Sequence, residues 1–110
     1  YSFKVPKKVR RAALISALSM KYQTEKMLVI KDIPMDEIKT KRFQEIVDRF
    51  ELRNVLFVID RPNAILEKSS RNIKDIKMIR TEGINVYDLL RYEHVVLLET
   101  SVKLIEGALS

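Results

Sequence analysis

The apolar positions of this chain form two kinds of pattern that alternate along the sequence. Four short runs are almost continuously apolar, as in strands that are buried on both faces, at residues 27–30, 55–59, 76–79 and 95–98. The stretches between them place apolar residues three, four and seven positions apart, which is the period of a helix with one buried face. This alternation predicts a single α/β globular domain over residues 1–110, with a mainly parallel four-stranded sheet covered by helices on both sides.

Polar residues just before the periodic stretches predict where helices begin. Thr40, Asn63 and Asn85 precede three predicted helices, and Thr100 or Ser101 precedes the last. Their side chains are of the type that caps a helix N-terminus.

Three further residues refine the predicted fold. Lys77 interrupts the apolar run at 76–79, which predicts an edge or half-exposed strand. Gly83 lies in a predicted turn and is a candidate for a positive φ. Asp88 is the third residue after Asn85, where a carboxylate suits both the cap and the helix dipole.

The net charge of +6 lies entirely in the first 21 residues. This segment has no acidic residue and six basic ones, Lys4, Lys7, Lys8, Arg10, Arg11 and Lys21. The other fifteen basic residues balance the fifteen acidic ones. A neutral body with one cationic end indicates an anionic partner, most commonly nucleic acid phosphate. A solvated basic face is one alternative. A membrane-surface helix is another, but it needs a basic face along its length, and here the cations crowd one end.

The first helix is predicted from about residue 7 to residue 22. Its opening turns hold Lys7, Lys8, Arg10 and Arg11, where the helix dipole favours acidic residues and like charges repel at three and four positions. A bound anion would relieve both effects. Residues 12–20 are apolar nearly all round, which predicts that the rest of the helix enters a core.

Composition excludes several classes of protein and site. With 46% hydrophobic and 33% charged residues the chain is globular, and without cysteine it has no disulfide, thiolate metal site or thiol nucleophile. The absence of cysteine fits a reducing compartment. No apolar run reaches membrane-spanning length, and no signal-peptide pattern is present. Two glycines cannot form a dinucleotide fingerprint or a P-loop.

The candidates for catalysis are few. Asp60 follows a predicted strand, where phosphotransfer domains keep a nucleophile or a metal ligand, and Asp32 could converge on it. A turn-forming Asp beside a proline is the favoured interpretation, since the neighbours of Asp60 supply no further acid. A magnesium-dependent, receiver-like domain using Asp60 remains the alternative function, and a protein-interaction module is the third. His94 has no partner motif and is expected to be structural or exposed.

The aromatic residues indicate RNA binding less strongly than the basic residues do. Tyr1 and Phe3 alternate with Ser2 and Lys4, so a strand-like segment would place both rings on one side. There they could stack on an unpaired base or pack on the body. Core or rim packing is expected for the other tyrosines after residue 80, Tyr87 and Tyr92.

Two long segments resemble the bacterial-type ribosomal protein L4 family of the large subunit. They are residues 1–14, YSFKVPKKVRRAAL, and residues 82–92, EGINVYDLLRY, and the intervening residues 69–72, SSRN, also fit. The resemblance spans essentially all of the chain. It implies a three-layer α/β/α domain with strand order 1-4-2-3, and a structural, non-enzymatic protein that needs no cofactor or metal.

The resemblance also implies partners and a place in the cell. The partners are large-subunit rRNA and neighbouring ribosomal proteins. The place is a cytoplasmic or organellar ribosome, without membrane contact. Some members of the family bind the leader of their own messenger RNA. In the family a long basic loop precedes the position of Tyr1 and lines the nascent-peptide tunnel. This sequence lacks that loop, and residues 1–6 would be an extended basic lead-in from it.

The expected RNA contacts are ten residues in two groups. The first group lies at the start of the chain, where its cations are expected to neutralise rRNA phosphates. Arg10 and Arg11 can each bind a phosphate bidentately, and the two aromatic rings can stack on an unpaired base or brace the strand. Its members are Tyr1, Phe3, Lys4, Lys7, Lys8, Arg10 and Arg11. The second group, Arg71, Asn72 and Arg91, is expected to form a further patch.

Overall fold

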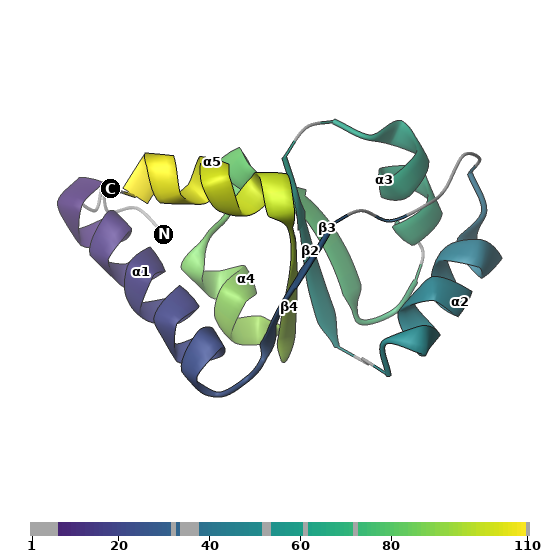
Figure 1. The fold of residues 1–110 in the computed structure, drawn as a ribbon, viewed down its shortest axis with the longest axis horizontal. Helices are drawn as coiled ribbons and strands as arrows, with labels where there is room; N and C mark the ends of the chain where they lie inside the picture. The colour runs from purple at the N-terminus through teal and green to yellow at the C-terminus, as the bar shows by residue number, and fades with distance from the viewer. Residues whose placement is uncertain are drawn as a thin grey trace.

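The computed structural model describes residues 7–31, 33, 38–51, 54–60, 62–71 and 73–109, which form an α/β fold (Figure 1). Helices and strands alternate as predicted. The strands are β1 (Met27–Ile30), β2 (Val55–Ile59), β3 (Ile76–Arg80) and β4 (His94–Leu98). The helices are α1 (Lys7–Gln23), α2 (Thr40–Arg49), α3 (Ala64–Ser70), α4 (Val86–Arg91) and α5 (Glu99–Leu109), with a 3-10 turn, η1 (Thr81–Gly83), before α4.

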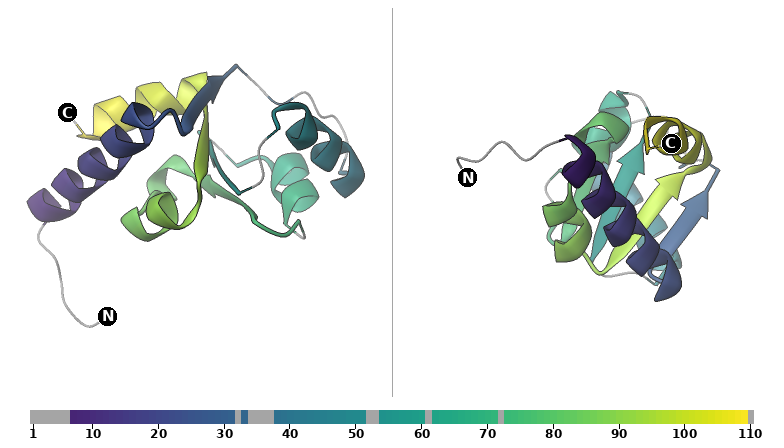
Figure 2. Two further views of the ribbon diagram at one scale, coloured as in Figure 1. Left: turned by 90° about the horizontal axis from the view of Figure 1, so that it is seen from below. Right: turned by 90° about the vertical axis from the view of Figure 1, so that its left-hand side faces the viewer.

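The sheet is parallel throughout, in the order β1-β4-β2-β3 (Figure 2). In the middle of the sheet, Val55 of β2 pairs with Ile76 of β3 on one side and with His94 of β4 on the other. Parallel neighbours need crossover connections, and the helices supply them. The order implied by the family resemblance is confirmed, and so is the edge position of β3 that Lys77 predicted.

Helices cover both faces of the sheet, which confirms the three-layer arrangement. Helices α2 and α3 lie on one side and α1, α4 and α5 on the other (Figure 1). On the first side, Phe43 of α2 meets Phe57 of β2 edge to face, with ring centroids 5.3 Å apart. On the second side, Ala17 of α1 and Leu89 of α4 pack with Val58 of β2. Alternate residues of β2 therefore serve two separate cores.

Strand β1 is less buried than its sequence predicts. Leu28 and Val29 are 38% and 47% exposed, because β1 has a neighbouring strand on one side only among the described residues. The prediction that residues 27–30 form a buried strand was wrong in this respect. A short apolar run looks the same at the edge and in the centre of a parallel sheet.

Two of the predicted helix caps are confirmed. The side-chain oxygen of Asn63 accepts from the N–H of Leu66 at 3.1 Å, and that of Asn85 accepts from the N–H of Asp88 at 2.8 Å. The Thr40 cap was wrong, since Thr40 is already inside α2 and the capping position falls on Lys39, whose side chain makes no cap.

The prediction for the last helix was also wrong. Helix α5 begins at Glu99, so neither Thr100 nor Ser101 precedes it. Ser101 is instead fully buried, and its hydroxyl donates to the carbonyl oxygen of Val58 at 3.2 Å. Gly83 ends η1 without a positive φ, so that prediction was wrong too.

Helix α1 contacts the core with one narrow stripe only. Ala17 is buried and Leu14 and Leu18 pack beside it, but Ile15 and Met20 are 43% and 44% exposed. The prediction that residues 12–20 enter a core on all sides was wrong. Helix α1 packs beside α4 at the outside of its layer, so no element covers its other faces in the described part of the chain (Figure 1).

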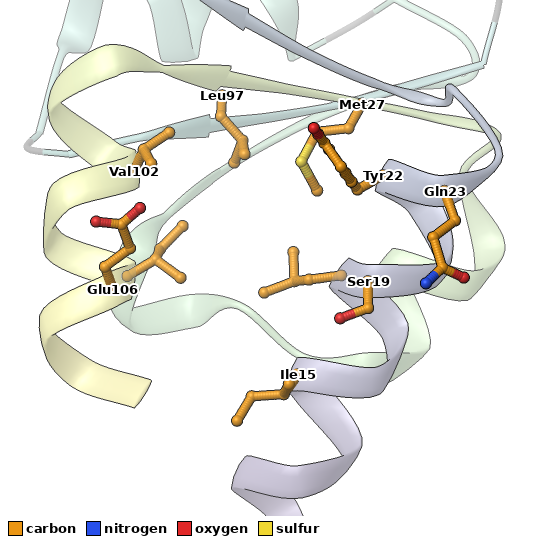
Figure 3. Close-up of a pocket in the computed structure, with 10 residues that line it drawn as sticks. Ile15, Ser19, Tyr22, Gln23, Met27, Leu97, Val102 and Glu106 are labelled. Carbon is orange, nitrogen blue, oxygen red and sulfur yellow. The ribbon is translucent and has the colours of Figure 1, made fainter. Parts of the chain in front are cut away.

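The exposed side of α1 borders an open apolar groove. The groove lies between α1 and α5 over the edge of the sheet and has a volume of about 580 Å³. Ile15 and Tyr22 of α1 line one wall, Val102 of α5 lines the other, and Met27 and Leu97 form the floor (Figure 3).

Candidate nucleic-acid interface

The cationic opening of α1 is exposed to solvent. Lys7 begins the helix, and residues 8–13 are all exposed. Lys8, Arg10 and Arg11 form the α1 basic end. The first turn contains no acidic residue, and none of these three side chains pairs with an acid among the described residues. The unfavourable charges at the helix start are thus not compensated within the described part of the chain.

Lys21 holds the other end of α1 against the body. It is 7% exposed, and its ammonium group donates to the carbonyl oxygens of Tyr92 at 2.6 Å and Glu93 at 3.1 Å. Burial lowers the pKa of Lys21 below 10.5, against the raising effect of the Glu93 carboxylate. Lys21 therefore does not belong to the exposed cationic surface with which the sequence grouped it. It anchors α1 so that the basic end projects.

A second ion pair lies beside this anchor. Lys26 donates to the Glu93 carboxylate at 2.9 Å; the Lys26 side chain is partly exposed and that of Glu93 is about half exposed. The hydrogen bond from Lys26 and its positive charge lower the pKa of Glu93. Glu93 is therefore held as a carboxylate next to the Lys21 ammonium group.

Among the other predicted contact residues, some have no described position, and Arg71 lies apart from the α1 basic end (Figure 1). Tyr1, Phe3, Lys4 and Asn72 lie outside the described residues. Arg71 is exposed at the end of α3, on the opposite side of the sheet from α1 (Figure 1).

Arg91 is not brought to the α1 basic end either. It is exposed at the end of α4, and its guanidinium carbon lies 5.3 Å from the ring centroid of Tyr92. The carbonyl of Tyr92 accepts from Lys21, so Arg91 lies by the last turn of α1 and not by its first.

The tyrosines near the end of the chain differ from each other. Tyr92 is 8% exposed, as expected for core packing, whereas Tyr87 is 72% exposed. The expectation of packing for Tyr87 was wrong, because Tyr87 lies on the side of α4 that faces away from Leu89 and the core.

The catalytic alternative gains no second ligand. Asp60 directly follows β2 and is half-buried, but Asp32 lies outside the described residues. Within the described ranges no group of three or more acidic or histidine side chains could hold a metal ion. His94 begins β4 and is half-buried, and its backbone N–H donates to the carbonyl of Asn54 at 2.9 Å, which fits the expected structural role.

The described part of the chain contains no helix that is both long enough and apolar enough to span a membrane.

Charge counting over the whole chain missed a second basic segment. Residues 64–80 contain five basic and two acidic residues, and residues 81–110 contain two basic and five acidic ones. The two excesses cancel, so the body appears neutral although its charge is separated. Counting basic and acidic residues separately for each predicted helix and strand would have revealed this segment from the sequence alone.

Comparisons with known proteins agree with the resemblance. A family model, ribosomal protein L4/L1 family, matches residues 1–108. The large ribosomal subunit protein uL4 of Syntrophus aciditrophicus is 61% identical over 99% of this chain and 50% of its own length. The proteins of the same name from Desulforapulum autotrophicum and Geobacter sulfurreducens are 50% and 39% identical, over 97% and 99% of this chain and 52% and 53% of their own lengths. The chain thus spans about half the length of the curated relatives it matches. Since the family model covers nearly all of its residues, the chain belongs to the ribosomal protein L4/L1 family.

Proposed function

We propose that this chain belongs to a structural constituent of the large ribosomal subunit and binds rRNA through the α1 basic end. The curated relatives are named as proteins of that subunit. One observation carries the proposal beyond the name. Three cations project from the body on a helix start where local electrostatics disfavours them.

The interaction would be made mainly with phosphate groups. Lys8, Arg10 and Arg11 would each neutralise a phosphate, and the planar guanidinium groups suit two phosphate oxygens at once. The N–H groups of the first turn, which have no partner within an α-helix, would add donors of the same kind. Lys4 and Lys7 would extend the surface, and Tyr1 and Phe3 would stack on an unpaired base or brace the lead-in. Such interactions position the protein by RNA shape and do not read sequence.

Two further kinds of partner belong to the proposal. Neighbouring ribosomal proteins would contact parts of the body that rRNA leaves free, and the leader of the protein's own messenger RNA is a candidate second ligand for the basic end. We propose no catalytic activity, cofactor or metal, in keeping with a structural role in a cytoplasmic ribosome.

The first prediction concerns affinity for rRNA as a function of salt. Changing Lys7, Lys8, Arg10 and Arg11 together to Gln should lower the affinity of the chain for transcribed large-subunit rRNA. It should also reduce the slope of log affinity against log salt by roughly 0.9 for each phosphate that the variant no longer neutralises. Filter binding between about 50 and 300 mM salt measures both quantities.

The control changes four exposed cations elsewhere to Gln, namely Lys31, Lys41, Arg49 and Lys103, and so removes the same charge. Its salt slope should stay near that of the unmodified chain. The quadruple variant at the basic end should fold at least as stably as the unmodified chain, because it removes like-charge repulsion at the helix start. Equal losses of affinity in both variants would mean that only total charge matters, and the proposed surface would be wrong.

A further inference from the structure

The second basic segment surrounds a concavity that the proposed surface does not use. The concavity lies between α3 and β3 and has a volume of about 490 Å³. This is within the roughly 300–1,000 Å³ range of small-molecule sites. We name it the α3–β3 concavity; its lining includes Glu67, Lys68, Arg71, Ile76, Lys77 and Met78.

The acidic groups around the concavity are already paired. The Glu67 carboxylate binds Arg80 at 3.2 Å and accepts from the N–H of Asn63 at 3.1 Å. The carboxylate of Asp88, 3% exposed, lies 3.0 Å from the ammonium group of Lys77. These pairs leave no uncompensated negative charge among the lining residues that the structure describes.

Two cations at the concavity remain available to a ligand. Lys68 and Arg71 are exposed on the last turn and C-cap of α3, and neither pairs with an acid among the described residues. Asp75, on the turn before β3, is balanced by its neighbour Lys74. The mouth therefore presents an ammonium and a guanidinium group that are three residues apart at the end of one helix, a spacing that makes them neighbours.

The floor has a different chemistry from the mouth. Ile76 is 9% exposed and Met78 is partly buried, and both pack against the core under α2 and α3. An apolar floor below a cationic mouth matches a nucleotide, which joins a flat, largely apolar base to a phosphate. A polyanion without a planar group would leave the floor uncovered.

We propose that the α3–β3 concavity binds one nucleotide unit of single-stranded RNA, with its phosphate on Lys68 and Arg71 and its base over Met78. The inference rests on the proposed RNA-binding function and adds a site to it. A recessed site favours a splayed nucleotide over the surface of a duplex. Helices α1 and α3 lie on opposite sides of the sheet, so this site is separate from the α1 basic end (Figure 1).

Methyl NMR with hexauridylate tests the proposal directly. The chain has four methionines, and ¹³C labelling of their methyl groups reports on the floor separately from other surfaces. The Met78 methyl signal should shift on addition of hexauridylate, while the signal of Met27 in the α1–α5 groove should not. Changing Lys68 and Arg71 to Gln should weaken the binding that Met78 reports about fivefold to tenfold.

A matched variant, Lys41→Gln with Arg49→Gln on α2, removes the same charge and should keep the Met78 shift. A Met78 signal that stays unmoved while amide signals of α1 shift would overturn this inference and leave the proposed function standing. Loss of RNA binding at α1 as well would overturn both. An equal Met78 shift with hexaglutamate would show that the site recognises charge alone, which also contradicts a nucleotide site.

Discussion

Lys21 shows how one residue fixes the direction of a helix. It lies in the last turn of α1, and its ammonium group reaches two carbonyl oxygens between α4 and β4. Those carbonyls belong to the segment that leads into a central strand, so the anchor connects α1 to the sheet. A buried cation is costly unless it is hydrogen-bonded, and the lowered pKa of Lys21 reflects that cost.

Replacing Lys21 by Met should lower the free energy of unfolding by about 1–3 kcal/mol at pH 7, because a buried hydrogen bond to the Tyr92 carbonyl and a partly buried one to the Glu93 carbonyl lose their charged donor. The effect should depend on pH. A lysine whose pKa is lowered by folding binds its proton less tightly in the folded state. The unmodified chain should therefore gain stability relative to Lys21→Met as pH rises from the lowered pKa toward 10.5. Urea unfolding of both proteins between pH 7 and pH 10.5 measures this difference, and a constant difference would refute it.

At the scale of elements, the sequence predicted strands and two caps but not which faces are covered. Asn63 and Asn85 cap helices because their short side chains accept from local N–H groups, and local chemistry is visible in sequence. The exposure of Val29 and Ile15 follows from the position of β1 at a sheet edge and of α1 outside its layer, which depends on distant partners. The basic end was predictable because charge is read directly from the sequence and the described residues 8–13 are exposed, so their placement does not depend on distant partners.

The Asn85 cap belongs to a larger polar cluster and should matter more than an ordinary cap. Besides accepting from Asp88, Asn85 donates to the Asp88 carboxylate at 2.8 Å and to the carbonyl of Gly83 at 3.1 Å. Asn85→Ala should therefore lower the free energy of unfolding by about 1–2 kcal/mol. Thr40→Ala is the matched control, since Thr40 was predicted as a cap and makes none; it should change stability by less than about 0.5 kcal/mol. Equal losses in thermal unfolding would refute the distinction.

At the scale of the whole molecule, two cationic surfaces are separated by the sheet (Figure 1). The α1 basic end and the α3–β3 concavity lie on opposite sides of the sheet, and residues 81–110, with three more acidic than basic residues, include α4, β4 and α5. Two separate cationic sites cannot act as one patch, since fields between exposed charges are screened within about 8–10 Å at moderate salt. If both proposals hold, the two surfaces would act as independent binding sites for RNA, and a chain held at both would be oriented as well as bound.

Independent sites have a consequence for stoichiometry, which rests on both proposals. With hexauridylate in excess, each site should fill with its own RNA molecule, so native mass spectrometry should detect two RNAs on each chain. Changing the α1 basic end to Gln should leave one RNA, and changing Lys68 and Arg71 to Gln should also leave one, whereas Lys41→Gln with Arg49→Gln should leave two. A single bound RNA in the unmodified chain would contradict this prediction. If the variant with Lys68 and Arg71 changed to Gln still bound two RNA molecules, the charge at the mouth of the concavity would not contribute to binding. The second site would then lie elsewhere on the body.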